Sequence, residues 1–273
     1  MVKKLFKHEF LFYARIMSIV YLLLFTVAGA NRIIQCFEND GVTYDIVFNI
    51  SCTTYGICVV AALGFGFVLS IVRFYKNLFT AEGYLTLTLP VTPGQHILVK
   101  VVSAVCVQVV TSLMILLSVC IITAGQMLVE IWKAAAYLFG KIYEAIGAQS
   151  IAIGGEVLLM FVLSLCAGIM LHYTFLSIGQ LFKKNRILAA VGAYFVFYIA
   201  SQVVSTVLMV IFSLLVASGA FDSFGVWFWD MVEQHPYWLV HGTIWIGILL
   251  VSIGILVEFL IMRRILTRKL NLE

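Results

Sequence analysis

Residues 187–221 have the sequence ILAAVGAYFVFYIASQVVSTVLMVIFSLLVASGAF, which contains no Asp, Glu, Lys or Arg. A helix needs about 20 consecutive apolar residues to cross the hydrocarbon core of a bilayer, so this run is long enough to span it. Further charge-free runs occupy residues 16–31, 46–72, 101–129, 157–182 and 239–257. They lack the alternation of polar and apolar residues that is typical of a membrane β-barrel. The sequence therefore predicts an all-α integral membrane protein with six transmembrane helices.

The composition of the whole chain agrees with a membrane location. Hydrophobic residues make up 63% of the chain and charged residues only 11%, whereas soluble domains are about 25% charged. The formal net charge of +4 does not indicate nucleic-acid binding, because the charges divide between the two sides of the membrane. The six cysteines are scattered, without a CxxC motif or a histidine at ligand spacing. Their pattern favours small buried side chains over metal ligands or disulfides, so no metal site is expected.

The basic residues indicate the orientation of the spans. With the N-terminus inside, only Arg32, Lys133 and Lys141 of the 17 basic residues lie on outer segments, as the positive-inside rule requires. We therefore expect a multi-pass protein of the plasma membrane with both termini in the cytoplasm. Within one transmembrane domain (1–273), the predicted elements are an amphipathic interfacial helix (1–14), transmembrane helices (16–36, 46–72, 97–128, 153–182, 187–218 and 239–262), a cytoplasmic loop (73–95), an extracellular amphipathic helix (130–146) and an outer interfacial or reentrant segment (221–238).

One acidic residue stands out in the N-terminal helix. Glu9 lies within the apolar arc that Leu5, Phe6 and Phe10 form at 100° per residue. A carboxylate without a partner is costly in such a position. We therefore expect Glu9 to contact a basic or polar side chain in the folded protein.

The cytoplasmic loop between the second and third spans is the most informative segment. Connections between helices usually take about 2 to 8 residues, so a longer loop with its own polar and apolar pattern suggests a specific role. Its run AEGYLTLTLPVTP (81–93), followed by QHILVK (95–100), resembles the corresponding segment of the ABC transporter type-2 permease family. In that family an acidic residue and a glycine precede a Leu-rich stretch and an LPVSP-like turn. Thr92 stands where serine is commoner.

The resemblance covers about twenty residues as a motif and nearly the whole chain as an architecture. It implies that residues 73–95 hold a coupling helix that docks into a cleft of a separate ATPase. The positions that it implicates in coupling are Phe79, Glu82, Gly83, Tyr84, Leu85, Leu89 and Pro90. Without the resemblance, Glu82 could be a solvated loop acid, and Pro90 could simply end the loop before the next helix.

The resemblance further implies an exporter subunit that is not itself an enzyme. The chain lacks the GxxxxGK[ST] motif that cradles phosphates, so we expect no cofactor on it and ATP with Mg²⁺ on the partner. The expected partners are two copies of a cytosolic ABC ATPase, a second permease subunit forming a homodimer or heterodimer, and membrane lipid. The expected substrate is amphipathic or hydrophobic, such as an antimicrobial peptide, a drug or a lipid-like molecule.

Polar residues within the spans leave alternatives open. Gln108, His172, Gln180 and Gln202 could line a pathway or form hydrogen bonds between helices, and the latter is the more ordinary role. No chain of Asp, Glu or His crosses the membrane, which argues against an ion-coupled carrier. The remaining alternative to an exporter is a six-helix membrane sensor or immunity protein that transports nothing.

Overall fold

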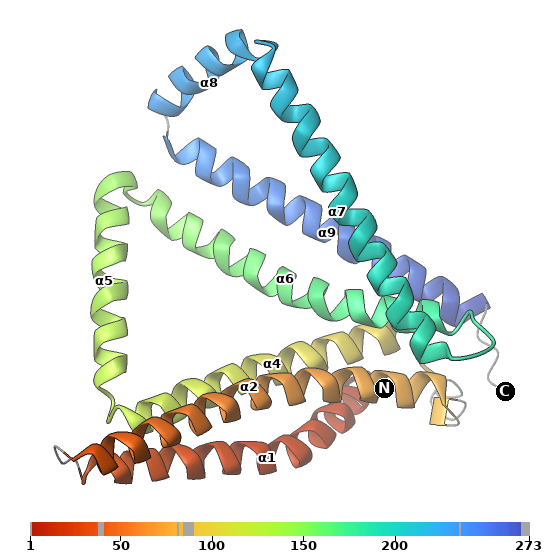
Figure 1. Cartoon of the computed structure of the whole chain (residues 1–273). Helices are drawn as coiled ribbons and strands as arrows, with labels where there is room; N and C mark the ends of the chain where they lie inside the picture. Colours follow the sequence, from red (N-terminus) through yellow and green to blue (C-terminus); the bar gives the residue numbers. More distant parts are fainter. Residues whose placement is uncertain (1, 38–40, 81, 84–89, 235, 269–273) are drawn as a thin grey trace. The chain divides into compact units, whose positions relative to one another are not determined.

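The computed structural model describes residues 2–37, 41–80, 82–83, 90–234 and 236–268, and within them it contains helices and no strands. In chain order the helices are α1 (Val2–Gln35), α2 (Val42–Phe79), α4 (Pro93–Ile122), α5 (Gln126–Ile146), α6 (Gln149–Gly179), α7 (Arg186–Ala217), α8 (Asp222–Gln234) and α9 (Pro236–Arg268) (Figure 1). Six of them, all except α5 and α8, are long and apolar enough to cross a membrane. The predicted fold class is therefore confirmed.

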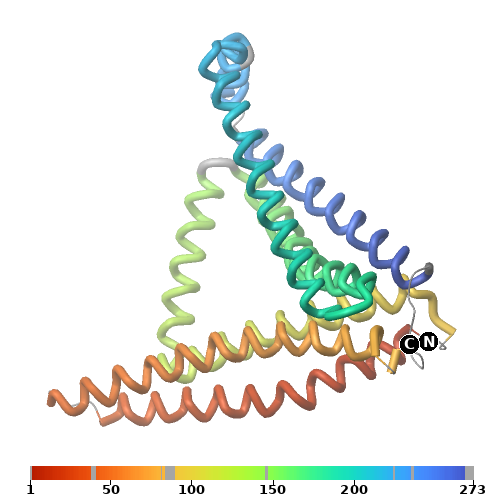
Figure 2. The backbone as a smooth tube through the Cα atoms, turned by 45° about the vertical axis from the view of Figure 1, so that its right-hand side comes forward, coloured from red at the N-terminus to blue at the C-terminus, as the bar shows by residue number. Residues whose placement is uncertain are grey.

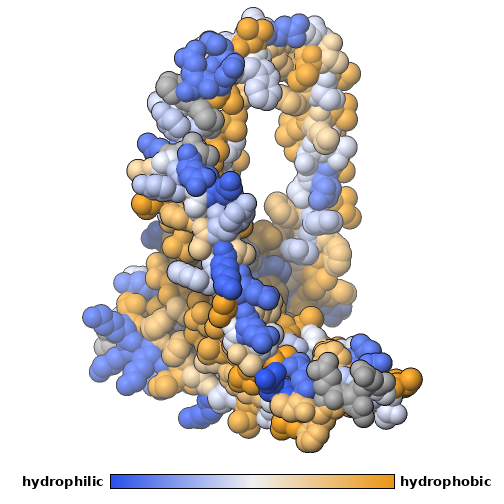
Figure 3. Space-filling model, turned by 90° about the vertical axis from the view of Figure 1, so that its left-hand side faces the viewer, coloured by the Kyte–Doolittle hydropathy of each residue, from blue (hydrophilic) through white to orange (hydrophobic). Residues whose placement is uncertain are grey.

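The helices pack into two units, which are described separately: Met1–Lys141 and Ile142–Asn271. Large apolar side chains are exposed on every candidate span, and Ala190 is the only buried residue that α7 contributes. Apolar side chains accordingly cover much of the surface seen in Figure 3. Such a surface is expected where lipid, rather than water, surrounds the helices.

In the first unit, α1, α2 and α4 lie side by side (Figures 1 and 2). Tyr13, Met17 and Val107 form a buried apolar cluster between α1 and α4. A Cβ atom on Gly66 of α2 would lie 3.2 Å from the terminal methyl of Met17, so glycine lets α2 approach α1 closely here. The absence of a side chain at this position thus contributes to the packing of the unit.

Hydroxyl groups join these helices within the apolar core. The Tyr21 hydroxyl of α1 lies 2.8 Å from that of Thr111 in α4, and the Tyr55 hydroxyl of α2 lies 2.7 Å from that of Ser118 in α4. Thr111 and Ser118 are fully buried. Since lipid offers no hydrogen-bond partners, such pairs between helices satisfy groups that would otherwise be costly.

In the second unit, α6 packs along α9 and against α7, and α8 contacts α9. A Cβ atom on Gly179 would lie 2.5 Å from the carbonyl oxygen of Arg186, so the turn from α6 into α7 has room only for glycine. Asn185 adopts a left-handed conformation with φ of 51° directly before α7, which reverses the chain within a few residues.

The bounds of α1 and α2 differ from the predicted ones. The two predicted segments 1–14 and 16–36 are not separated, because α1 runs without a break from Val2 to Gln35, and the interfacial position of residues 1–14 stays a prediction. Helix α2 continues to Phe79, so residues 73–79 extend the second span instead of forming a separate helix in the loop. The run of apolar and helix-forming residues through Leu78 explains why the helix does not end at Arg73.

Helix α4 is shifted toward the N-terminus relative to the predicted span 97–128. It begins at Pro93 because Thr92 forms a capping box: its Oγ1 accepts from the Gln95 amide, and the Gln95 side chain accepts from the Thr92 amide. It ends before Ala124 and Gly125, which have φ of 50° and 80°. Residues 126–128 consequently belong to α5.

Candidate functional site

A buried cluster of charged side chains surrounds Glu9 near one end of the first unit. Glu9 Oε1 accepts hydrogen bonds from Asn77 Nδ2 at 2.9 Å and from Lys100 Nζ at 3.0 Å. Its other oxygen, Oε2, accepts from Arg73 Nε at 3.3 Å. The Glu9 side chain is 5% exposed and that of Lys100 is 4% exposed. The expectation that Glu9 contacts basic and polar partners is therefore confirmed.

Helical spacing places these groups on facing surfaces. Arg73 and Asn77 are four residues apart on α2, so both side chains project from one face of that helix. Lys100 lies near the beginning of α4, and Glu9 lies on α1 one turn before Phe12. The Arg73 guanidinium carbon stands 3.9 Å from the centroid of the Phe12 ring, so a cation–π contact holds it in place as well. The cluster therefore connects α1, α2 and α4.

The charges in this cluster extend to the predicted coupling loop. The single carboxylate of Glu9 forms ion pairs with two cations, Arg73 and Lys100. The carboxylate of Glu82, which follows α2 in the loop, also interacts electrostatically with Lys100. Two acids and two bases thus balance one another. Because charges attract more strongly in surroundings of low dielectric constant than in water, the ion pair with Glu9 holds Lys100, and Glu82 adds a weaker attraction.

Some polar atoms beside these charges have no hydrogen-bond partner among the described residues. Both ring nitrogens of His96 are buried and lack one, as does Asn77 Oδ1. His96 also interacts electrostatically with Lys100 and Glu9. A buried polar group without a partner costs about 1–3 kcal/mol. The cluster therefore combines strong ion pairs with groups that a different arrangement of the helices could satisfy better.

The loop residues that are described lie directly on the end of α2. Phe79 is buried against the Phe74 ring, with centroids 5.7 Å apart. Gly83 is also buried, and a Cβ atom there would lie 2.6 Å from the carbonyl oxygen of Leu78, so only glycine fits. Glu82 and Pro90 are exposed. The other predicted coupling residues, Tyr84, Leu85 and Leu89, lie outside the described residues.

The predicted pathway residues fall into both units. Gln108 is on α4, and its Oε1 is a buried atom without a partner among the described residues. His172 Nδ1 contacts the Gly168 carbonyl at 2.6 Å, and Gln180 donates to its own helix at 3.5 Å. Gln202 is exposed on α7. The role of these side chains as pathway residues stays a prediction.

Sequence reasoning missed a second polar cluster, in the second unit. Glu156 of α6 lies 2.8 Å from His241 Nδ1 and accepts a hydrogen bond from Trp245 Nε1, also at 2.8 Å. The four-residue spacing of His241 and Trp245, which places both on one face of α9, was the signal that could have identified its partners.

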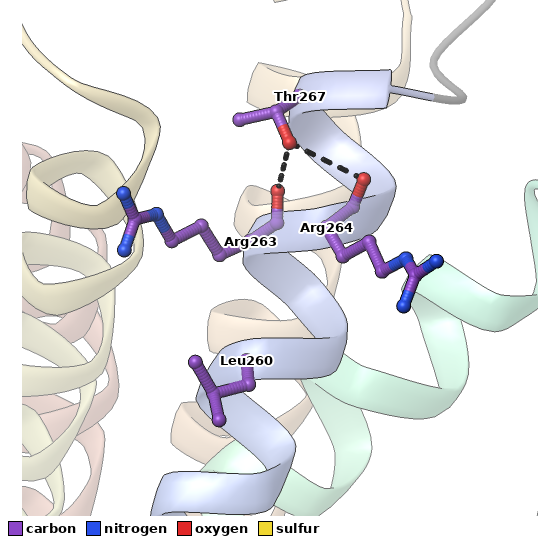
Figure 4. Close-up of a pocket in the computed structure, with 4 residues that line it drawn as sticks. All are labelled: Leu260, Arg263, Arg264 and Thr267. Atoms are coloured by element: carbon purple, nitrogen blue, oxygen red, sulfur yellow. Dashed lines mark hydrogen bonds between the residues drawn. The ribbon is translucent and has the colours of Figure 1, made fainter.

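The C-terminal end of α9 is basic. Leu260, Arg263, Arg264 and Thr267 line a pocket there (Figure 4). The Thr267 hydroxyl donates to the carbonyl oxygens of Arg263 and Arg264 at 2.9 and 3.3 Å, while the two guanidinium groups point to opposite sides of the helix. Cations at this end complement the helix dipole and agree with the predicted cytoplasmic location.

Comparisons with known proteins do not identify a relative of this chain. No protein-family model, no curated protein and no solved structure matches this chain. The family resemblance of residues 81–100 therefore stays a prediction, and the buried cluster around Glu9 is the strongest structural indication of a functional site.

Proposed function

We propose that this chain is the permease subunit of an ATP-driven ABC exporter of the plasma membrane. It would pair with a second permease subunit and bind two copies of a cytosolic ATPase, which supply ATP and Mg²⁺. The exported substrate would be amphipathic or hydrophobic. The observation that supports this proposal most is the position of Glu82: it belongs to the family-like motif, and its carboxylate acts on a buried lysine that is bonded to another helix.

The contacts supply a route from the loop to the spans. The exposed Glu82 attracts Lys100 of α4, and Lys100 donates to Glu9 of α1. Glu9 in turn accepts from Arg73 and Asn77 of α2. An ATPase that displaces Glu82 would therefore change the forces on a group that all three helices share. Such a displacement shifts the conformational equilibrium by the difference between the two states' affinities for the ATPase.

A crosslinking experiment tests this function in cells. A photoreactive amino acid placed at Glu82 or at Pro90 should form crosslinks to an ATP-binding cassette protein, identified by mass spectrometry. Both residues are exposed, so the reactive group can reach a partner. Lys141 provides the matched control, because it is exposed but lies on a predicted outer segment.

The outcomes separate the exporter from its alternative. An ABC ATPase recovered from positions 82 and 90, and not from 141, supports the exporter. A sensor or immunity protein would yield no ABC ATPase at either loop position, and that result would refute the proposal. Purified complex should also lose ATP-stimulated transport when Glu82 is changed to Gln, while Glu144→Gln on the outer segment should leave it unchanged.

A further inference from the structure

Helix α5 has two faces of opposite character. Its polar side chains recur every three or four residues, which places them on one arc of the helix. They are Gln126, Glu130, Lys133, Tyr137, Lys141 and Glu144. Most of the remaining circumference is apolar, with Leu128, Ile131, Trp132, Leu138, Phe139 and Ile142. Among the described side chains of α5 none is buried, and Trp132 is 75% exposed. These apolar side chains are therefore exposed on the surface of the helix.

The connections of α5 restrict where this face can lie. Three residues join α4 to α5, and two join α5 to α6. The first turn contains Ala124 and Gly125 with positive φ, and the second contains Gly147 with φ of 60°. Three extended residues reach about 10 Å, whereas the 21 residues of α5 are about 31 Å long.

These lengths exclude an upright helix. Both α4 and α6 are candidate membrane spans, and consecutive spans place the segment between them on one side of the membrane. If α5 stood upright, one of its ends would lie about 31 Å from the membrane, farther than a short connection can reach. In Figures 1 and 2, α5 runs crosswise to α4, as a helix along the membrane surface would.

We infer that α5 lies in the outer headgroup boundary of the membrane and inserts its apolar face among the acyl chains of phospholipids. The apolar arc is wider than the stripe with which a helix contacts a single neighbouring helix. Trp132, Tyr143 and Phe139 supply the aromatic side chains that favour the membrane–water interface.

The charges on α5 define the kind of lipid that it fits. Glu130 and Glu144 balance Lys133 and Lys141, so the polar face has no net charge. Interfacial helices that depend on anionic lipids are instead rich in Lys and Arg. Helix α5 therefore binds a zwitterionic surface as well as an anionic one. This inference does not depend on the proposed exporter function.

Spin labels on the full-length chain in phosphatidylcholine nanodiscs test this placement. The six native cysteines are replaced, and single cysteines are introduced on the apolar face (Leu138, Ile142) and on the polar face (Lys133, Lys141). Oxygen concentrates in the acyl chains and a polar nickel chelate in water. The ratio of oxygen to nickel collisions should be several-fold higher at Leu138 and Ile142 than at Lys133 and Lys141.

Two results would overturn the inference. Equal nickel access on both faces would mean that α5 stands in water. Immobile labels at Leu138 and Ile142 that neither reagent reaches would mean that protein, such as a second copy of the chain, covers this face. Nanodiscs that contain phosphatidylglycerol serve as a second measurement, because a helix without net charge should give the same collision ratios there. A pattern that appears only with the anionic lipid would contradict the assigned lipid chemistry.

Discussion

Replacing Glu9 by Gln is the sharpest test of the buried cluster. Glutamine keeps the size of the side chain but removes the charge that holds Lys100, whose side chain is 4% exposed. It also presents an amide to Asn77 and Arg73 in place of a carboxylate. The substitution should therefore destabilise the first unit without creating a cavity.

The expected magnitude follows from the distances and the burial. At the 3.0 Å separation of Lys100 Nζ and Glu9 Oε1, and with an effective dielectric constant near 20, the attraction is about 5–6 kcal/mol. Breaking a buried pair by removing one partner costs about 3–5 kcal/mol, because it leaves the other charge unpaired. Glu82 still attracts Lys100 in the variant, and Arg73 keeps its contact with Phe12. We expect a loss at the lower end of this range, about 3 kcal/mol.

The free energy of unfolding of the unaltered chain and of the Glu9→Gln variant is measured in bicelles by steric trapping, and the two values are compared. The double variant Glu9→Gln/Lys100→Met should recover most of the loss, because it removes the charge that the single variant leaves unpaired. Glu130→Gln on the exposed face of α5 is the matched control and should change stability by less than about 0.5 kcal/mol. A loss below about 1 kcal/mol for Glu9→Gln, or a double variant no more stable than the single one, would refute the reasoning.

Two further predictions concern the second unit and the topology. Gly179→Ala should destabilise the turn between α6 and α7 by about 1–3 kcal/mol, because the added methyl would lie 2.5 Å from a backbone oxygen. Gly168→Ala on the same helix meets no atom within 4 Å and should be neutral or slightly stabilising in the same unfolding assay. Single cysteines at Asp222 and at Lys184, in a cysteine-free chain, should react with an impermeant reagent from opposite sides of the membrane. Labelling from the same side would contradict the six-span topology.

Much of the fold was predictable because hydropathy determines it directly. A charge-free run such as 187–221 has few alternatives to a membrane helix, and α7 covers Arg186–Ala217. The exact bounds were harder, since they depend on local chemistry. The capping box of Thr92 and the positive φ of Gly125 displaced α4, and a hydropathy pattern contains neither signal.

The candidate site was predictable only in part. The position of Glu9 on an apolar arc indicated that it needs a partner, because an isolated buried carboxylate is unstable. Its partners could not be named, since Asn77 and Lys100 are 68 and 91 residues away in the chain. The contacts of His241 and Trp245 with Glu156 were not predicted for a similar reason. Their spacing places both residues on one face of α9, but only the packing of the helices brings that face to Glu156.

The hydroxyl pairs along α4 restrict how α1, α2 and α4 can move relative to one another. A slide of α1 or α2 past α4 by one turn, about 5.4 Å, would separate Tyr21 from Thr111 or Tyr55 from Ser118. Thr111 and Ser118 would keep their hydrogen bonds to carbonyl oxygens of α4, but the tyrosine hydroxyl would lose its partner in the bilayer. Rocking the three helices together breaks none of these bonds. The three helices can therefore tilt together as a rigid body. A small tilt about the end near Lys100 then produces a larger sideways displacement at the opposite end, beside Ser118.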